Sequence, residues 1–529
     1  MTEGASQLQR SRNVSRNLIF GYINRFFALL LPFIVRTALI YRFGAVYLGV
    51  NSLFASIFQA LNLAELGFST AIVYSLYKPV AEEDTETVCA YLGTYRTVYR
   101  VIGLVILAAG LAVMPFFPYL LKGSDVPGDV NLFAWYLIFL ADAVLSYLLF
   151  GYKTAIPSAL QRNDLLSKVD TVALIGKSLL QMTCLLFTKN FYFYLLCSLL
   201  FTVVRNVLVS EMVRRRFPQY QARGRIDAAQ FGELKQLVGG LFLSKARGAS
   251  RHMIDSICIT AFVSLTMTAI YSNYFLVLNA VISLSGILCA AMTASVGNSI
   301  AVENREKNYA DMRRFNFMYL LLAGWAAICM FCLYQPFTEL WVGRHLMLGM
   351  REVVALCLYF YVLKMGDMRW IYHEGSGLWW KARYIVIAEI VCNIVLNIVL
   401  AKYWGVLGII VATLLSLFFI NFLGGSRILF KEYFKNGKLG EFFRDQALYF
   451  CVTAVIAVLC WRGCEEIGGW LGGGSAGMLG LVARLLLCTI VTLAGYYLAY
   501  HRTARYKDAK DWVWNRYSAM NLNFLRISD

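Results

Sequence analysis

Charged side chains that interrupt long apolar stretches are the residues of this sequence with the clearest capacity for chemistry. The stretch at 236–263 contains Lys245, Arg247, Arg251 and Asp255. Helical residues four apart share a face, which places Arg247, Arg251 and Asp255 in one row. Guanidinium groups are costly in an apolar medium and usually face a cavity or a partner. Their planar fork donates two aligned hydrogen bonds to phosphate oxygens. The pattern predicts a cationic chamber that receives an anionic head group.

A second pair of arginines, Arg25 and Arg36, interrupts the apolar stretch at 18–42. They are eleven residues apart, which places them on nearly one helical face. The predicted substrate-binding residues of the chamber are therefore Arg25, Arg36, Lys245, Arg247 and Arg251. The alternative interpretation is structural, because a basic side chain can also pair internally or extend its charged end to the membrane surface.

Acidic residues inside apolar stretches are fewer, and they are candidates for coupling to an ion gradient. The candidates are Glu65, Asp142, Asp255 and Glu389. Asp142 lies near the centre of its stretch, where a desolvated carboxylate can bind a proton or a sodium ion. Asp255 has a second interpretation, because it lies one helical turn from Arg251 and would neutralise it there.

No catalytic, nucleotide-binding or metal-binding motif is complete in the sequence. Gly-Lys-Ser at 176–178 resembles the end of a phosphate-binding loop, but Thr171 occupies the required upstream glycine position. The four histidines lack metal-ligand spacing, and the thirteen cysteines fit reduced packing residues better than a disulfide framework. We therefore predict no catalytic residue, no metal and no cofactor.

Transmembrane helices are the elements that must position these charges. Of the 529 residues, 59% are hydrophobic and only 15% are charged, too few to cover a soluble surface of this size. Apolar runs of about 20 residues recur along the chain, and the backbone in lipid must satisfy its own hydrogen bonds, which leaves helices. The predicted fold is an all-α integral membrane protein with fourteen transmembrane helices at about 18–42, 46–75, 88–114, 131–153, 168–187, 190–213, 236–263, 268–299, 315–334, 351–372, 384–401, 405–426, 446–464 and 478–500.

Lysine and arginine indicate how the helices are oriented. They are concentrated in the segments that lie on the same side of the membrane as the N-terminus, above all in the central loop at 214–235. They are sparse in the loops on the opposite side. This bias predicts a multi-pass protein of the cytoplasmic membrane with both termini cytoplasmic. It also explains most of the net charge of +18 without nucleic acid as a partner. The short outer loops disfavour a membrane glycosyltransferase or polymerase, which needs acidic catalytic residues there.

The predicted helices divide at the basic central loop into groups of six, six and two. A shift of 222 residues lays one half on the other and places Arg25 on Arg247 and Asn51 on Asn273. Parallel repeats of this kind are a standard transporter architecture, with the substrate cavity between the halves. The predicted organisation is a cytoplasmic segment 1–17, an N-lobe 18–213, a basic linker 214–235, a C-lobe 236–430 in a pseudo-twofold arrangement with the first, two further helices within 431–500, and a cytoplasmic interfacial tail 501–529.

Short motifs along the chain resemble those of a known superfamily. They are Leu-Gly-Val-Asn-Ser-Leu-Phe at 48–54, Glu-Leu-Gly-Phe at 65–68, Ile-Tyr-Ser-Asn-Tyr at 270–274, Ser-Val-Gly-Asn at 295–298, Leu-Trp-Val-Gly at 340–343 and Trp-Gly-Val-Leu-Gly at 404–408. With these motifs and its hydropathy profile, the sequence resembles Wzx-type oligosaccharide flippases of the multidrug/oligosaccharidyl-lipid/polysaccharide exporter superfamily.

The resemblance implies a MATE-like fold and a function in surface polysaccharide biosynthesis. Such flippases move a polyprenyl-pyrophosphate-linked oligosaccharide to the outer leaflet by alternating access. Membrane lipids surround them during transport, and a proton or a sodium ion is the candidate coupling cation. By position, Arg25 and Arg247 would meet the pyrophosphate and sugar, with Arg36 and Arg251 as further candidates. A lipid II flippase is a close alternative. A drug/cation antiporter of the same superfamily is a second, although those antiporters usually have twelve helices.

Overall fold

Helices form almost the entire protein in the computed structural model. The structure describes residues 3–65, 67–121, 126–188, 190–378, 380–435, 437–470 and 477–527, and these contain no strand. Within these ranges, no side chain is described at 3–15, 64, 243–244, 247, 249–250, 294, 467–470 and 516–527. The predicted all-α fold is therefore confirmed.

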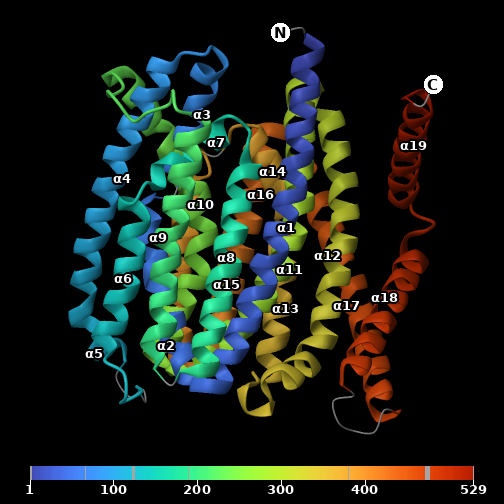
Figure 1. The fold of residues 1–529 in the computed structure, drawn as a ribbon. Coiled ribbons are helices and arrows are strands. Elements are labelled where there is room, and N and C mark those ends of the chain that lie inside the picture. The colour runs from blue at the N-terminus through green and yellow to red at the C-terminus, as the bar shows by residue number, and fades with distance from the viewer. Residues whose placement is uncertain are drawn as a thin grey trace. The chain divides into compact units, whose positions relative to one another are not determined.

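Contacts divide the chain into two compact units, Met1–Ser272 and Asn273–Asp529. The helices of the first unit (Figure 1) are α1 Glu3–Phe43, α2 Ala45–Leu61, α3 Phe68–Ala81, α4 Thr85–Val113, α5 Phe117–Leu120, α6 Leu132–Leu148, α7 Ala155–Ala159, α8 Asn163–Phe187, α9 Phe191–Arg216 and α10 Ala228–Phe262. α11, Leu265–Val302, begins in the first unit and continues into the second. The second unit also contains α12 Arg305–Val342, α13 Met350–Met365, α14 Asp367–Gly375, α15 Arg383–Leu415, α16 Gly425–Leu429, α17 Leu439–Trp470, α18 Gly477–Tyr500 and α19 Ala504–Ile527.

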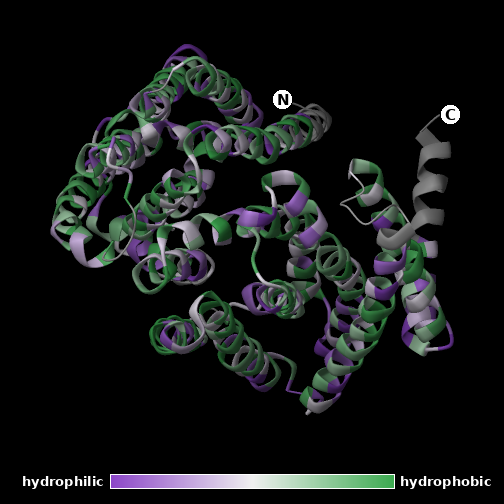
Figure 2. Cartoon of the chain, turned by 90° about the horizontal axis from the view of Figure 1, so that it is seen from below, coloured by the Kyte–Doolittle hydropathy of each residue, from purple (hydrophilic) through white to green (hydrophobic). Residues whose placement is uncertain are grey.

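Many of these helices are suited to lipid. In the part of the chain that the structure describes, nine helical segments are long and apolar enough to cross a membrane, or ten if the bent pair Leu132–Leu148 and Gly151–Ala159 forms one span. Figure 2 shows hydrophobic residues distributed along all of the long helices, with hydrophilic residues between them. On α18, the side chains of Leu479 and Leu498 are 83% and 71% exposed, as expected of residues that face lipid tails. The protein is a multi-pass membrane protein.

The predicted number of fourteen spans is compatible with these helices but is not confirmed by them. The segment Arg383–Phe434 covers two predicted spans, and it bends at Gly405, whose φ of 57° and ψ of −130° are not helical. A positive φ of this kind favours glycine because it has no Cβ. The predicted span at 46–75 is broken between α2 and α3, and the one at 351–372 is broken between α13 and α14.

α10 covers most of the predicted seventh span at 236–263. It carries Lys245, Arg247, Arg251 and Asp255 within its last five turns. It begins with a capping box, in which Asp227 accepts a hydrogen bond from the Gln230 backbone and the Gln230 side chain accepts one from the Asp227 backbone. α10 packs against α2 and α3 within the first unit. The six-helix lobes predicted on either side of the linker 214–235 stay a prediction.

α2 closely approaches the start of α11 near Gly49. A Cβ added at Gly49 would overlap the backbone of Leu265, at the start of α11. We therefore expect Gly49→Ala to destabilise the protein by about 1–3 kcal/mol, because a tightly packed backbone contact must open. The measurement is the thermal unfolding midpoint of the detergent-purified chain.

Gly21→Ala in α1 is the matched control for Gly49→Ala. Nothing lies within 4 Å of a Cβ added at Gly21. Alanine is a better helix former than glycine by about 1 kcal/mol, so this variant should be as stable as the unmodified protein or more stable. Equal midpoints for the two variants would contradict the close approach of α2 to the α10–α11 turn.

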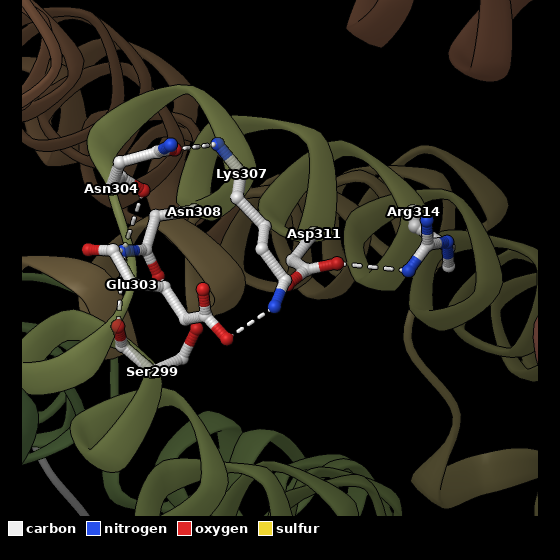
Figure 3. A network of polar contacts seen from close by, with 7 residues as sticks. All are labelled: Ser299, Glu303, Asn304, Lys307, Asn308, Asp311 and Arg314. Atoms are coloured by element: carbon white, nitrogen blue, oxygen red, sulfur yellow. Dashed lines mark hydrogen bonds and ion pairs between the residues drawn. The ribbon is translucent and has the colours of Figure 1, made fainter.

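The turn from α11 to α12 is fixed by the polar network of Figure 3. Asn304 caps α12 by accepting a hydrogen bond of 2.9 Å from the Lys307 backbone. The buried Asn308 side chain donates to the backbone carbonyls of Ser299, Glu303 and Asn304. Lys307 pairs with Glu303 across one helical turn. These bonds satisfy backbone groups that neither helix can satisfy alone.

A similar cap begins α4, where the Asp84 side chain accepts a hydrogen bond of 3.0 Å from the Thr87 backbone. Hydrogen bonding from Thr87 stabilises the charged form and lowers the pKa of Asp84.

The C-terminal helix α19 is attached to the second unit at its start. Arg505 pairs with Asp445 of α17, and Asp508 pairs with Arg314 of α12 at 2.7 Å. The interfacial location predicted for the tail 501–529 stays a prediction.

Candidate functional site

Arg36 lies in the apolar part of α1 and is held by polar groups of two other helices. Its Nη2 donates a hydrogen bond to Ser272 Oγ of α11. Ser272 Oγ in turn shares a hydrogen bond of 2.9 Å with Ser52 Oγ of α2. Arg36 also interacts electrostatically with His252 of α10. Arg36 of α1 therefore lies near His252, the residue that follows Arg251 in α10, within the first unit.

The charged row of α10 is largely removed from solvent. The side chains of Arg251 and Asp255 are only 7% and 2% exposed. Tyr271, the neighbour of Ser272 in the chain, donates a hydrogen bond of 3.1 Å from its hydroxyl to Asp255 Oδ2. The His252 ring lies against the Tyr271 ring with a centroid distance of 5.9 Å. Tyr271 thus connects the row on α10 to the network around Arg36.

The remaining predicted cations differ in their surroundings. Lys245 is exposed, and its Nζ donates a hydrogen bond of 2.5 Å to Thr70 Oγ1 of α3. Arg25 is exposed on α1, three turns before Arg36. The Arg247 side chain lies outside the described residues, and only its place in α10 is established. The structure therefore links the surroundings of Arg36, through Ser272 and Tyr271, to Asp255 in the row that also contains Arg251, and the roles of Arg25 and Arg247 stay predictions.

Glu65 lines a polar cavity of about 520 Å³ within the first unit. The Tyr95 hydroxyl donates to the Tyr99 hydroxyl at 2.7 Å, and the Tyr99 hydroxyl donates to Glu65 Oε1 at 2.9 Å. Arg205 lines the same cavity and pairs with Asp170 at 2.8 Å. This cavity is lined by a hydrogen-bonded chain of two tyrosine hydroxyls and a carboxylate and by the Arg205 guanidinium, an arrangement that can hold polar ligands or conduct protons.

Asp142 is half-buried near the middle of α6. Its Oδ1 makes no hydrogen bond with the residues that the structure describes. Lys177 of α8 interacts with it electrostatically. An unsatisfied buried carboxylate oxygen is costly, so a proton or a cation would stabilise it.

Glu389 belongs to a buried network in the second unit. The Asn421 amide donates to Glu389 Oε2 at 2.6 Å, and Arg369 Nη2 donates to Asn421 Oδ1 at 2.8 Å. Arg369, Glu389 and Asn421 are 1%, 2% and 4% exposed. Asn421 lies in the π-helix Ser416–Gly424, whose wider turns often occur at functional sites.

A second buried network of this unit includes an acid that the sequence analysis did not select. Asp367 Oδ2 accepts hydrogen bonds from Lys364 Nζ at 2.9 Å and from the Tyr319 hydroxyl at 2.6 Å. Asp367 begins α14, directly after the helix break at Gly366. The sequence does contain a signal for this site, because Lys364, Gly366 and Asp367 interrupt the predicted span at 351–372.

An apolar groove of about 500 Å³ lies between α11, α12 and α18 in the second unit. Its walls include Leu284 of α11, Trp325 and Phe337 of α12, and Leu481 and Leu485 of α18. Such a surface suits hydrocarbon and offers little to a polar ligand. α18 belongs to the predicted pair of helices that follows the two groups of six.

The fold is similar to that of solved membrane transporters. A structure described as the lipid II flippase MurJ in an inward closed conformation has a TM-score of 0.64 and 13% identity, and the match covers 92% of this chain and 99% of that one. An inward-facing multidrug resistance MATE family transporter of the MOP superfamily has a TM-score of 0.60 and 14% identity, with 78% and 96% covered. A mutant of the Vibrio cholerae MATE transporter VcmN has a TM-score of 0.55 and 14% identity, with 80% and 98% covered.

No family model and no curated protein matches the sequence. At these identities the structural likeness shows the fold alone. The chain has the fold of MOP-superfamily transporters, and the similar structures are transporters and flippases rather than enzymes.

Proposed function

We propose that this protein is a flippase that moves a polyprenyl-pyrophosphate-linked oligosaccharide across the cytoplasmic membrane for surface polysaccharide biosynthesis, by alternating access. The observation that supports the proposal is the polar network that joins Arg36 of α1, through Ser272 and its neighbour Tyr271, to Asp255 in the charged row of α10. Because buried guanidinium groups are retained at a cost, a role in binding an anionic head group explains their presence.

The apolar groove supports a cargo that carries a lipid. A flippase must give the head group a polar route while the tail stays among hydrocarbon. The groove between α11, α12 and α18 has hydrophobic walls of the right character for a polyprenyl chain. A small-molecule antiporter has no need of such a surface.

The proposed coupling to an ion gradient rests on acidic residues within the predicted spans. Asp142 is the first candidate because its Oδ1 lacks a hydrogen-bond partner among the described residues and Lys177 is near. Glu65 is the second, because it ends a chain of tyrosine hydroxyls at a polar cavity. We propose that one of them exchanges a proton or a sodium ion during the transport cycle.

A lipid II flippase is the second candidate function. The structure of such a flippase covers 92% of this chain, whereas the two MATE structures above cover 78% and 80%. The larger match favours a flippase over a drug/cation antiporter, and the shared pyrophosphate chemistry makes the two kinds of flippase difficult to distinguish by their cationic residues.

Deletion of the gene tests the proposal. We expect the lipid-linked oligosaccharide to accumulate in the inner leaflet while lipid II is still translocated, because only the step that follows assembly is lost. The measurement is accessibility of each lipid-linked sugar to a membrane-impermeant reagent in spheroplasts. Accumulation of inner-leaflet lipid II would instead establish the second candidate, and normal translocation of both lipids would overturn the proposal.

A further inference from the structure

Three buried cysteines from three helices converge in the second unit. Cys332 of α12, Cys464 of α17 and Cys488 of α18 have sulfur atoms that all lie within 4.8 Å of one another. The Sγ atoms of Cys464 and Cys488 are 3.7 Å apart. Figure 1 shows α17 and α18 side by side, and both pack against α12. The three residues are separated by long stretches of sequence, so no short metal-binding motif marks them.

The spacing of the sulfur atoms suits a metal ion. A disulfide would need a separation of about 2.05 Å. Zinc–thiolate bonds of about 2.3 Å in a tetrahedral arrangement place neighbouring sulfur atoms about 3.8 Å apart. Apolar packing of neutral thiols is the simpler explanation for a single buried cysteine, but it does not require three of them to point at a common centre.

A cation near the cluster supplies the second observation. Arg484 of α18 interacts electrostatically with Cys464. Its Nε is buried and has no hydrogen-bond partner among the residues that the structure describes. A buried donor without an acceptor is costly, and a negatively charged metal–thiolate group nearby would compensate for it.

We propose that Cys332, Cys464 and Cys488 bind one zinc ion as thiolates. Three thiolates and Zn²⁺ carry a net charge of −1, which Arg484 balances, whereas Cu⁺ at the same ligands would leave a net negative charge in an apolar region. Binding releases the three thiol protons to solvent. Three protein ligands leave one position for water, a common zinc coordination. The ion connects α17 and α18 to α12 and so fixes α12 and α18, which both border the apolar groove.

Metal analysis of the full-length chain, purified in detergent without chelator, tests the proposal. We expect about one Zn²⁺ per chain in elemental analysis. After removal of the metal, titration with Cd²⁺ should produce the ultraviolet charge-transfer absorption of cadmium–thiolate bonds, with saturation at about one equivalent. Absence of zinc together with absence of this absorption would overturn the proposal, and so would retention of Cu⁺ with no Zn²⁺.

Cysteine variants assign the site. Cys464→Ser and Cys488→Ser should each lose the bound zinc and the cadmium absorption. Cys357→Ser is the matched control, because Cys357 is a buried cysteine of α13 outside the cluster, and it should keep both. Equal zinc content in Cys464→Ser, Cys488→Ser and Cys357→Ser would place the metal elsewhere and overturn the assignment.

Arg484→Gln tests the proposed charge balance without removing a ligand. We expect the affinity for Cd²⁺ to fall about 10- to 100-fold, as is usual when a group that supports metal ligands is replaced. Because all three thiols remain, this result does not depend on whether the serine variants fold. An unchanged affinity would show that Arg484 does not balance a metal–thiolate charge and would overturn that part of the assignment.

Discussion

Arg36→Ala is expected to reduce translocation of the lipid-linked oligosaccharide by about 10- to 100-fold, because a hydrogen bond to a charged group contributes about 1.5–3 kcal/mol. The physical reason is that Arg36 is presented by α1 inside an apolar environment, where its attraction to a pyrophosphate is weakly screened. Its Ser272 contact orients the guanidinium, and the Ser52–Ser272 hydrogen bond holds that acceptor in place. The measurement is the rate of appearance of the oligosaccharide at the outer leaflet, normalised to the amount of protein in the membrane.

Two variants separate the charge of Arg36 from its structural contacts. Arg36→Lys keeps the charge but loses the planar fork that matches phosphate oxygens, so it should retain part of the activity. Ser272→Ala removes the hydroxyl that accepts from Arg36 while keeping the guanidinium, and its effect should be smaller than that of Arg36→Ala. If Ser272→Ala were as severe as Arg36→Ala, orientation within the network would matter more than charge.

Arg42→Ala is the matched control on the same helix. Arg42 is exposed in the last turn of α1, six residues after Arg36, and the same substitution there removes a charge from a solvated position. We expect nearly unchanged translocation. The role of Arg36 would be refuted if Arg36→Ala, present in the membrane at the normal level, transported as well as Arg42→Ala.

Hydropathy predicts the helices well because every helix in a lipid environment needs apolar side chains along most of its length. The apolar runs around α4, α8 and α12 are helices at nearly the predicted positions. The details within a run depend on single residues. Gly405 is the first residue of the predicted span 405–426 and has a non-helical conformation, and the Trp-Gly pair at 404–405 is a sufficient signal for this break. The break between α2 and α3 has only a weak signal in the sequence, at Gly67. The sequence therefore predicts one continuous span at 46–75.

The candidate site is harder to predict because its contacts join distant parts of the chain. The sequence indicates that Arg36 is costly inside a helix, but its partner Ser272 is 236 residues away and belongs to another helix. Serine is an ordinary residue in membrane helices, so nothing in the sequence identifies Ser272. The same holds for Asn421, which connects Arg369 to Glu389 from within a π-helix. The sequence reveals which groups need a partner, and only the fold shows which residue is the partner.

Arg369→Ala should have the largest effect on stability, about 3–5 kcal/mol, because it removes the cationic member of a buried polar network that also contains the Glu389 carboxylate. Arg369 is 1% exposed, and Gly425 provides the space for its guanidinium, since a Cβ at that position would overlap it. Asn421 would lose the hydrogen bond from Arg369, while the Glu389 carboxylate would remain buried. The measurement is the thermal unfolding midpoint of the purified chain, which should fall by far more than in Arg344→Ala. Arg344 is 76% exposed in its pair with Glu339, and such pairs contribute about 0–1 kcal/mol.

The double variant Arg369→Met with Glu389→Gln distinguishes loss of charge balance from loss of packing. Both side chains are then uncharged, and the glutamine amide keeps an oxygen that accepts from the Asn421 amide, so part of the lost stability should return. If the double variant is no more stable than Arg369→Ala, an uncompensated charge is not the cause.

The same double variant also tests Glu389 as a coupling residue. With stability restored, gradient-driven translocation should persist if Glu389 is only structural and should be lost if its carboxylate binds the ion, because glutamine cannot exchange a proton or replace an anionic ligand.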